Sequence, residues 1–217
     1  MKPNLHSTMS LASYVTAQID RLIPDGAASE CESLVAAYLP EALARTQHCI
    51  DQVKMWPQGQ FNYLHSSQYC IFLYYLSNSI WRATAESAVP TRLFLLNKAL
   101  NGIDIFYEIQ MPNVFFIGHS VGIVLAKARY GEYLALYQNS TIGRTGQDVP
   151  TIGDRVVIYP HSAIVGRSNV ADGSVLSYGT RVINASTAKD MVAYNTDGGE
   201  LLFKPQKRRF IEDFFRL

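Results

Sequence analysis

Histidine and cysteine are the side chains of this sequence best suited to acid–base, nucleophilic or metal chemistry. A histidine has an unperturbed pKa near 6.5 and can move a proton close to neutral pH. His119 and His161 lie far apart with no third ligand at a suitable spacing, which argues against a metal site. Three scattered cysteines (Cys31, Cys49 and Cys70) predict reduced, partly buried thiols rather than a disulfide framework. We interpret the remaining histidines as structural: His6, His48 and His65.

A six-residue repeat governs the C-terminal half of the chain. Aliphatic residues recur six apart, with a small hydroxyl residue four positions after each of the last five. The aliphatic positions are Ile152, Ile158, Ile164, Val170, Leu176 and Val182, and the hydroxyl positions are Ser162, Ser168, Ser174, Thr180 and Ser186. Such a period predicts a parallel β-helix in which three hexads make one triangular coil and the aliphatic side chains stack inward.

The same register continues upstream in a weaker form. Its inward positions would be Ile105, Met111, Ile117, Ile123, Arg129, Ala135 and Thr141, and Arg129 violates the pattern. The break at residues 143–151 (GRTGQDVPT) predicts a loop that leaves the β-helix, since glycine and proline suit such an excursion.

The first half of the chain has helical periodicity instead. Apolar residues follow a 3.6-residue period over 11–23, and a second apolar stretch over 66–82 predicts a buried helix. Pro40 is expected to start a helix, and Gly102 to end one that follows Pro90. We therefore expect an α+β protein with an α-helical domain (1–102), a β-helix (103–189) and a C-terminal strand/helix tail (190–217).

Three short segments resemble the hexapeptide-repeat acyltransferases, specifically their serine acetyltransferase branch. Residues 118–124 (GHSVGIV) resemble the catalytic motif DHATGVV, residues 139–146 (NSTIGRTG) resemble QSVTLGGTG, and residues 149–154 (VPTIGD) resemble HPKIGD. The resemblance covers about residues 65–189. It implies a left-handed parallel β-helix, acetyl-CoA as co-substrate and no metal.

The resemblance also implies site residues. His119 falls on the catalytic base, and Asp104 falls on the aspartate that orients it. A hydroxyl is a poor nucleophile until a base removes its proton, and a carboxylate on the other ring nitrogen stabilises the imidazolium that forms. Residues expected to bind the co-substrate are Gly143, Arg144, Thr145, Gly146, Pro160, Tyr178 and Lys204, and those expected to bind the acceptor are Gly118, Asp148 and His161.

The sequence departs from the family where the family binds serine. Gly118 replaces the aspartate of the DH pair, and Asp148 and Val149 replace the Arg-His of the loop. Because these residues would read the charged ends of an amino acid, the departures favour O-acetylation of a saccharide, such as a surface polysaccharide or its precursor. Three alternatives stay open: a serine O-acetyltransferase, an N-acetyltransferase on a nucleotide-linked amino sugar, and a non-catalytic β-helix assembly module.

Composition bears on partners. The formal net charge is +1, which gives no reason to expect nucleic acid. Only 17% of the residues are charged and 48% are apolar, so few charged side chains are available to cover the surface of a monomer. We therefore expect an oligomer, and the resemblance to the hexapeptide-repeat acyltransferases implies a homotrimer or a dimer of trimers. The sequence predicts no signal peptide and no integral membrane segment, and so a cytoplasmic protein.

Overall fold

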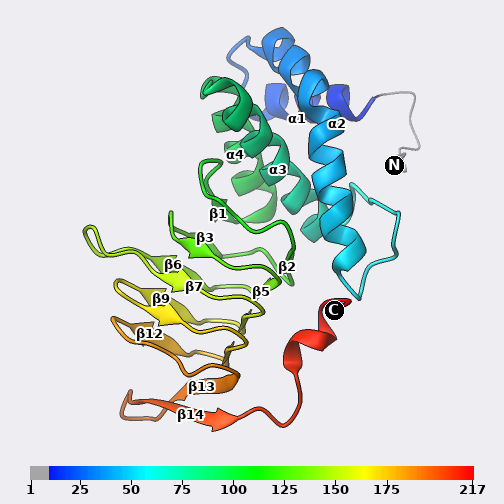
Figure 1. Cartoon of the computed structure of the whole chain (residues 1–217). Helices are drawn as coiled ribbons and strands as arrows, with labels where there is room; N and C mark the ends of the chain where they lie inside the picture. Colours follow the sequence, from blue (N-terminus) through cyan, green and yellow to red (C-terminus); the bar gives the residue numbers. More distant parts are fainter. Residues whose placement is uncertain (1–9) are drawn as a thin grey trace.

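The computed structural model describes residues 10–217, in which helices are followed by a stack of short parallel strands and a C-terminal segment (Figure 1). The α+β prediction is confirmed. The helices are α1 (Leu11–Leu22), α2 (Ala28–Gln52), α3 (Ser66–Thr84) and α4 (Ala88–Asn101). As predicted, α4 ends at Gly102, whose φ of 62° is the left-handed conformation that a glycine adopts without a steric penalty.

The predicted helix start at Pro40 is wrong. Helix α2 runs through this proline without a break. A proline inside a helix removes one backbone hydrogen bond and costs roughly 3 kcal/mol. The buried residues Val35, Ala42 and Cys49 lie on both sides of it and hold one continuous helix face in the core. Tertiary burial here outweighs the local preference.

Helix α3 connects the helices to the first turn of the β-helix. Every residue from Ser67 to Ile80 is buried, as its apolar circumference predicts. Its polar groups bond to the irregular backbone that precedes the second strand. Tyr74 Oη donates to Ile109 O (2.6 Å), and Asn78 Nδ2 donates to Tyr107 O (2.7 Å). No helix in the described part of the chain has the length and hydropathy needed to cross a membrane.

The strands form three faces of a β-helix, and they pair in parallel except for β14. We name each face after its first strand. The β1 sheet contains β1 (Asp104–Ile105), β3 (Val124–Leu125), β6 (Thr141–Gly143), β9 (Ala163–Val165) and β12 (Arg181–Ile183). The β4 sheet contains β4 (Arg129–Tyr130), β7 (Thr151–Ile152) and β10 (Asn169–Val170). The β2 sheet contains β2 (Phe115–Ile117), β5 (Leu134–Leu136), β8 (Val157–Ile158), β11 (Val175–Leu176), β13 (Met191–Asn195) and β14 (Leu201–Pro205).

The six-residue period predicts the buried positions correctly after residue 151, where the repeat is regular, but not upstream, where it is weaker. Below the loop, Ile164 pairs with Val182 and Ile152 pairs with Val170, and all four side chains are buried. Upstream, the predicted inward position Thr141 is wrong, and Arg129, which violates the pattern in the sequence, is exposed. Their neighbours Tyr130 and Ile142 carry the register instead, since they pair with Ile152 and Ile164. The upper coils differ in length, so a strict period loses phase there.

The small hydroxyl residues lie at the corners and bond across coils. Ser162 Oγ donates to Tyr159 O (2.8 Å) and lies 3.2 Å from Ser177 O, one coil below. Thr180 and Ser168 make the same kind of paired contact. Ser186 is an exception, because it is exposed and Thr187 is buried in its place. A small side chain is therefore required for space and also to satisfy corner carbonyls.

The C-terminal segment first extends the β-helix and then turns back along it. Strand β13 pairs in parallel with β11, so the coil structure continues past residue 189, and β14 returns antiparallel to β13. The chain then rises to the 3-10 helix η1 (Phe210–Asp213) and ends near the C-terminal end of α2 (Figure 1).

Candidate functional site

His119 lies on a corner of the first coil, where the β2 sheet passes to the β1 sheet. Hydrogen bonds fix this corner on both sides. Gly118 N donates to Leu136 O (2.8 Å), and Ser120 Oγ donates to Asn101 O (2.6 Å) at the end of α4. Ser67 of α3 lies 3.3 Å from Gly118 O. The backbone is thus held by both halves of the molecule while the imidazole remains exposed.

His119 opens onto a cleft between the helical half and the β-helix. The cleft measures about 300 Å³ and is lined by Met55, Trp56, His65, Ser67, Phe116, Gly118, His119 and Tyr137. The lining includes three aromatic rings besides the two histidines, and no Asp, Glu, Lys or Arg. Such a wall suits a neutral or apolar surface, because a charge placed against it would lose hydration without gaining a partner.

Gly118 is required by a close approach of Tyr137. A Cβ atom at position 118 would lie 2.4 Å from Tyr137 Cε1, a distance that real side chains do not adopt. The Tyr137 ring is stacked on Tyr159 (5.7 Å between centroids, 21° between planes) and has little freedom to move. Position 118 therefore has no room for a side chain while Tyr137 is in place.

Asp104 begins β1, and its amide donates to Ile123 O (2.8 Å), just beyond the His119 corner. Its carboxylate accepts from Lys98 Nζ at 2.6 Å. Within residues 10–217 no hydrogen bond joins the side chains of Asp104 and His119. The pair thus shares a coil, and its direct contact stays a prediction.

The predicted co-substrate loop folds as a short hairpin. Thr145 and Asp148 exchange two backbone hydrogen bonds of 3.0 Å, and Arg144 is exposed. The Asp148 carboxylate faces the Arg167 guanidinium at 3.3 Å. Gly143 O accepts from Gly166 N (3.1 Å), while Gly146 has a φ of 59°. None of these residues lines the His119 cleft of the same chain.

Other predicted residues lie on the His119 edge of the β-helix, two and three coils below His119. His161 packs against Tyr178 (5.1 Å between ring centroids) and lies 3.3 Å from Asn139 Nδ2. Pro160 O accepts from Gly179 N (2.9 Å), so it belongs to the same column of corners. Lys204 is distant from this column, on β14, where its ammonium lies over the Tyr194 ring.

Sequence reasoning missed most of the cleft wall. Trp56 and His65 come from the turns between α2 and α3, and neither belongs to a repeat. His65 was expected to be only structural, yet it lines the cleft. Tyr137 had only an approximate signal, because an 18-residue coil would place it below His119, whereas the β2–β5 register is 19 residues and places it below Gly118. Of the other histidines, His48 lies in α2, and His6 lies outside the described residues.

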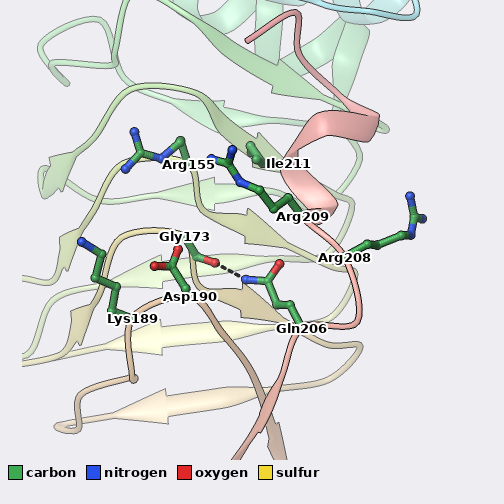
Figure 2. A pocket seen from close by; sticks show the side chains of 8 residues that line it. All are labelled: Arg155, Gly173, Lys189, Asp190, Gln206, Arg208, Arg209 and Ile211. Carbon is green, nitrogen blue, oxygen red and sulfur yellow. Dashed lines mark hydrogen bonds between the residues drawn. The ribbon is translucent and has the colours of Figure 1, made fainter.

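A larger hollow of about 470 Å³ lies on another corner, where the β4 sheet passes to the β2 sheet (Figure 2). Arg155, Lys189 and Asp190 line it, and the C-terminal segment crosses it. Gln206 Nε2 donates to Gly173 O at 2.6 Å and fixes the start of that crossing. The hollow contains no predicted catalytic residue, although its volume is larger than that of the His119 cleft. No group of three or more His, Cys, Asp or Glu residues in 10–217 is placed to hold a metal ion.

Comparison with known sequences finds partial matches to serine acetyltransferases. No family model matches the chain. Curated serine acetyltransferases do match: that of Bacillus subtilis is 26% identical over 120 residues, which cover 49% of this chain and 55% of the relative. That of Synechocystis is 32% identical over 82 residues, covering 36% and 33%. The chain thus spans about a third to a half of the length of these relatives.

Solved serine acetyltransferases share the whole fold. The Neisseria gonorrhoeae structure aligns over 94% of this chain and 83% of its own, with a TM-score of 0.71 and 12% identity. The Vibrio cholerae structure aligns over 93% and 82%, with a TM-score of 0.71 and 16% identity. Soybean serine acetyltransferase complexed with serine aligns over 89% and 85%, with a TM-score of 0.66 and 15% identity. The fold is that of the serine acetyltransferases.

Proposed function

We propose that this protein is an acetyl-CoA-dependent O-acetyltransferase in which His119 is the general base. The observation that carries the proposal is the rigid, exposed His119 corner at the mouth of a cleft between the two halves. The imidazole would take the proton of an acceptor hydroxyl as its oxygen attacks the thioester carbonyl. The C–S bond then breaks, and the proton passes to the departing CoA thiolate.

Asp104 is proposed to orient the imidazole. For this its carboxylate has to accept from His119 Nδ1 as well as, or in place of, Lys98 Nζ. Lys98 is half-exposed, so its ion pair with Asp104 is weak and easily exchanged. The co-substrate would lie along the His119 edge, with the loop residues of a neighbouring subunit beside it.

L-Serine is the first candidate acceptor, and the comparisons support it. The curated relatives are serine acetyltransferases, and solved relatives with this fold include complexes with serine. Transfer to serine would need partners for its ammonium and carboxylate groups. The cleft wall of this chain supplies none, so they would come from the neighbouring subunit or the loop.

A saccharide is the second candidate, and the Gly118–Tyr137 contact favours it. Tyr137 leaves no room for a side chain at position 118, where the motif that this sequence resembles has an aspartate. A sugar offers neutral hydroxyls and apolar C–H faces, which suit an aromatic wall with few charges.

Release of CoA thiol from acetyl-CoA tests the proposal, with L-serine, neutral saccharides and nucleotide-linked amino sugars as parallel acceptors. We expect His119→Asn to lower turnover by about 100-fold or more, since general-base catalysis contributes 10²–10⁴. His48→Asn is the matched control, because His48 is an exposed histidine of α2 that does not line the cleft. Unchanged turnover in His119→Asn would remove His119 from the mechanism, and no turnover with any acceptor would favour an assembly module.

A further inference from the structure

The end of the chain is hydrogen-bonded to the turn that follows α2, more than 150 residues earlier in the sequence. Lys54 N donates to Phe214 O (2.7 Å), and Arg216 N donates to Gln52 O (2.9 Å). Val53 and Phe215 form an antiparallel bridge between these contacts. Figure 1 shows the segment in red reaching the cyan end of α2.

The Arg216 side chain extends this junction. Its guanidinium donates to the carbonyls of Asp51 (3.0 Å), Lys54 (3.2 Å) and Trp56 (2.9 Å), and also to that of Val53. The last carbonyls of a helix have no partner within the helix, and a cation there also complements the helix dipole. One side chain therefore organises both the end of α2 and the turn after it.

That turn forms part of the His119 cleft. Met55 and Trp56 line the cleft directly, and Trp56 packs on Phe116 (5.5 Å between ring centroids). Phe214, two residues before Arg216, packs behind the opposite wall at 5.6 Å from Phe116 and 6.0 Å from Tyr137. The C-terminal segment thus supports both aromatic walls from behind without entering the cleft.

We propose that residues 210–217 are a specificity element for the acceptor, with Arg216 as the positioning residue for Trp56. What the cleft binds rests on the proposed function, whereas the support of its wall does not. Loss of Arg216 frees the turn that carries Met55 and Trp56. Binding of the acceptor then weakens, while His119 and the corner of the β-helix proposed to bind acetyl-CoA keep their geometry.

The test compares Arg216→Gln and Arg216→Lys with Arg209→Gln, which changes the arginine just before this segment, whose ion-pair partner is Glu212. The first readout is amide hydrogen exchange of residues 53–57, with the β9 strand as internal reference. The second is the emission maximum of Trp56 in a Trp81→Phe background. The third is the KM for the acceptor beside the KM for acetyl-CoA.

We expect Arg216→Gln to speed exchange at 53–57, to shift Trp56 emission to longer wavelength, and to raise the acceptor KM about tenfold. The last figure corresponds to the loss of one or two net hydrogen bonds. The KM for acetyl-CoA and the rate of amide exchange in β9 should not change. Arg216→Lys should show smaller changes in exchange, emission and acceptor KM than Arg216→Gln. Should Arg216→Gln fail to fold, Phe214→Leu provides the same readouts from the opposite wall.

Two failures are distinguishable. If the unmodified protein transfers acetyl groups to no acceptor, the proposed function fails, while exchange and emission still report on the wall. If Arg216→Gln leaves exchange at 53–57 and Trp56 emission as in Arg209→Gln, the positioning role is wrong whatever the activity. An equal rise in both KM values would also overturn it, because that result indicates general loosening.

Discussion

At the scale of single residues, Gly118 and Tyr137 behave as one unit. We expect Gly118→Ala to destabilise the protein by about 1–3 kcal/mol, because overpacking forces a side chain from its place. The added Cβ meets Tyr137 Cε1 at 2.4 Å, and Tyr159 blocks the retreat of the ring. Urea unfolding of the single and double variants measures the effect.

Two variants make that prediction specific. In a Tyr137→Ala background the ring is absent, so Gly118→Ala should cost almost nothing further. Gly143→Ala is the control at another glycine of the β-helix, where the nearest atom lies 3.6 Å away, an ordinary contact. Additive effects of the two substitutions would show that the ring is not what excludes a side chain from position 118.

The site could be predicted from sequence only where a repeat or motif fixes positions. His119 and Gly118 follow from the motif, and Tyr137 lies about one coil later, although the β2–β5 register is 19 residues rather than 18. Trp56 and His65 could not be found this way, because they lie in irregular turns whose path is set by α2, α3 and the chain end. The same limit applies to Arg216, whose four carbonyl partners lie more than 150 residues away.

At the scale of elements, repetition made the β-helix predictable and its absence made the helices less so. The clean hexads after residue 151 predicted buried Ile164 and Val182 without error. The prediction at Thr141 was wrong, and the repeat was violated at Arg129, because coils of unequal length shift the register. Pro40 failed because burial on both sides of α2 outweighs the local cost of a proline.

The packed helices also predict alkaline sensitivity. Burial raises the pKa of Cys49 in α2 and of Cys70 in α3 to about 12. An unfolded thiol has a pKa near 8.5, so above that pH the unfolded chain loses protons that the native state keeps. Stability is therefore full below about pH 8.5 and falls as pH rises toward 12. The slope is up to about 1.4 kcal/mol per pH unit for each thiol.

Urea unfolding at pH 7.5, 8.5, 9.5 and 10 checks this slope. Cys49→Ser with Cys70→Ser is the informative variant, since a hydroxyl does not titrate in this range and the slope should flatten. Cys31→Ser is the control, because burial raises the pKa of Cys31 without taking it as far. An unchanged slope in the double variant would mean that other groups govern the alkaline loss.

At the scale of the whole molecule, the low fraction of charged residues and the outer face of the β1 sheet both indicate that copies of the chain associate. Val124 and Ile183 are 45% and 55% exposed on that sheet, and Val121 is 64% exposed at its His119 edge. Val165 lies between them, half-buried. Val165 is in register with Ile183, whereas Val124 is in register with Thr141, Ala163 and Arg181. Exposed aliphatic side chains on one face of a prism are a surface that a second copy of the chain would cover.

We therefore expect the protein to be a homotrimer, or a pair of trimers, joined through the β1 sheet. Sedimentation should give three or six times the mass of the 24.3 kDa chain. Val124→Lys with Ile183→Lys should yield monomers, since an unpaired charge buried at an interface costs several kcal/mol. Leu22→Lys is the control, at a position 45% exposed at the end of α1. A monomeric mass for the unmodified protein would contradict the assembly. It would also contradict the proposal that the loop of residues 143–151 lies beside the co-substrate of a neighbouring subunit.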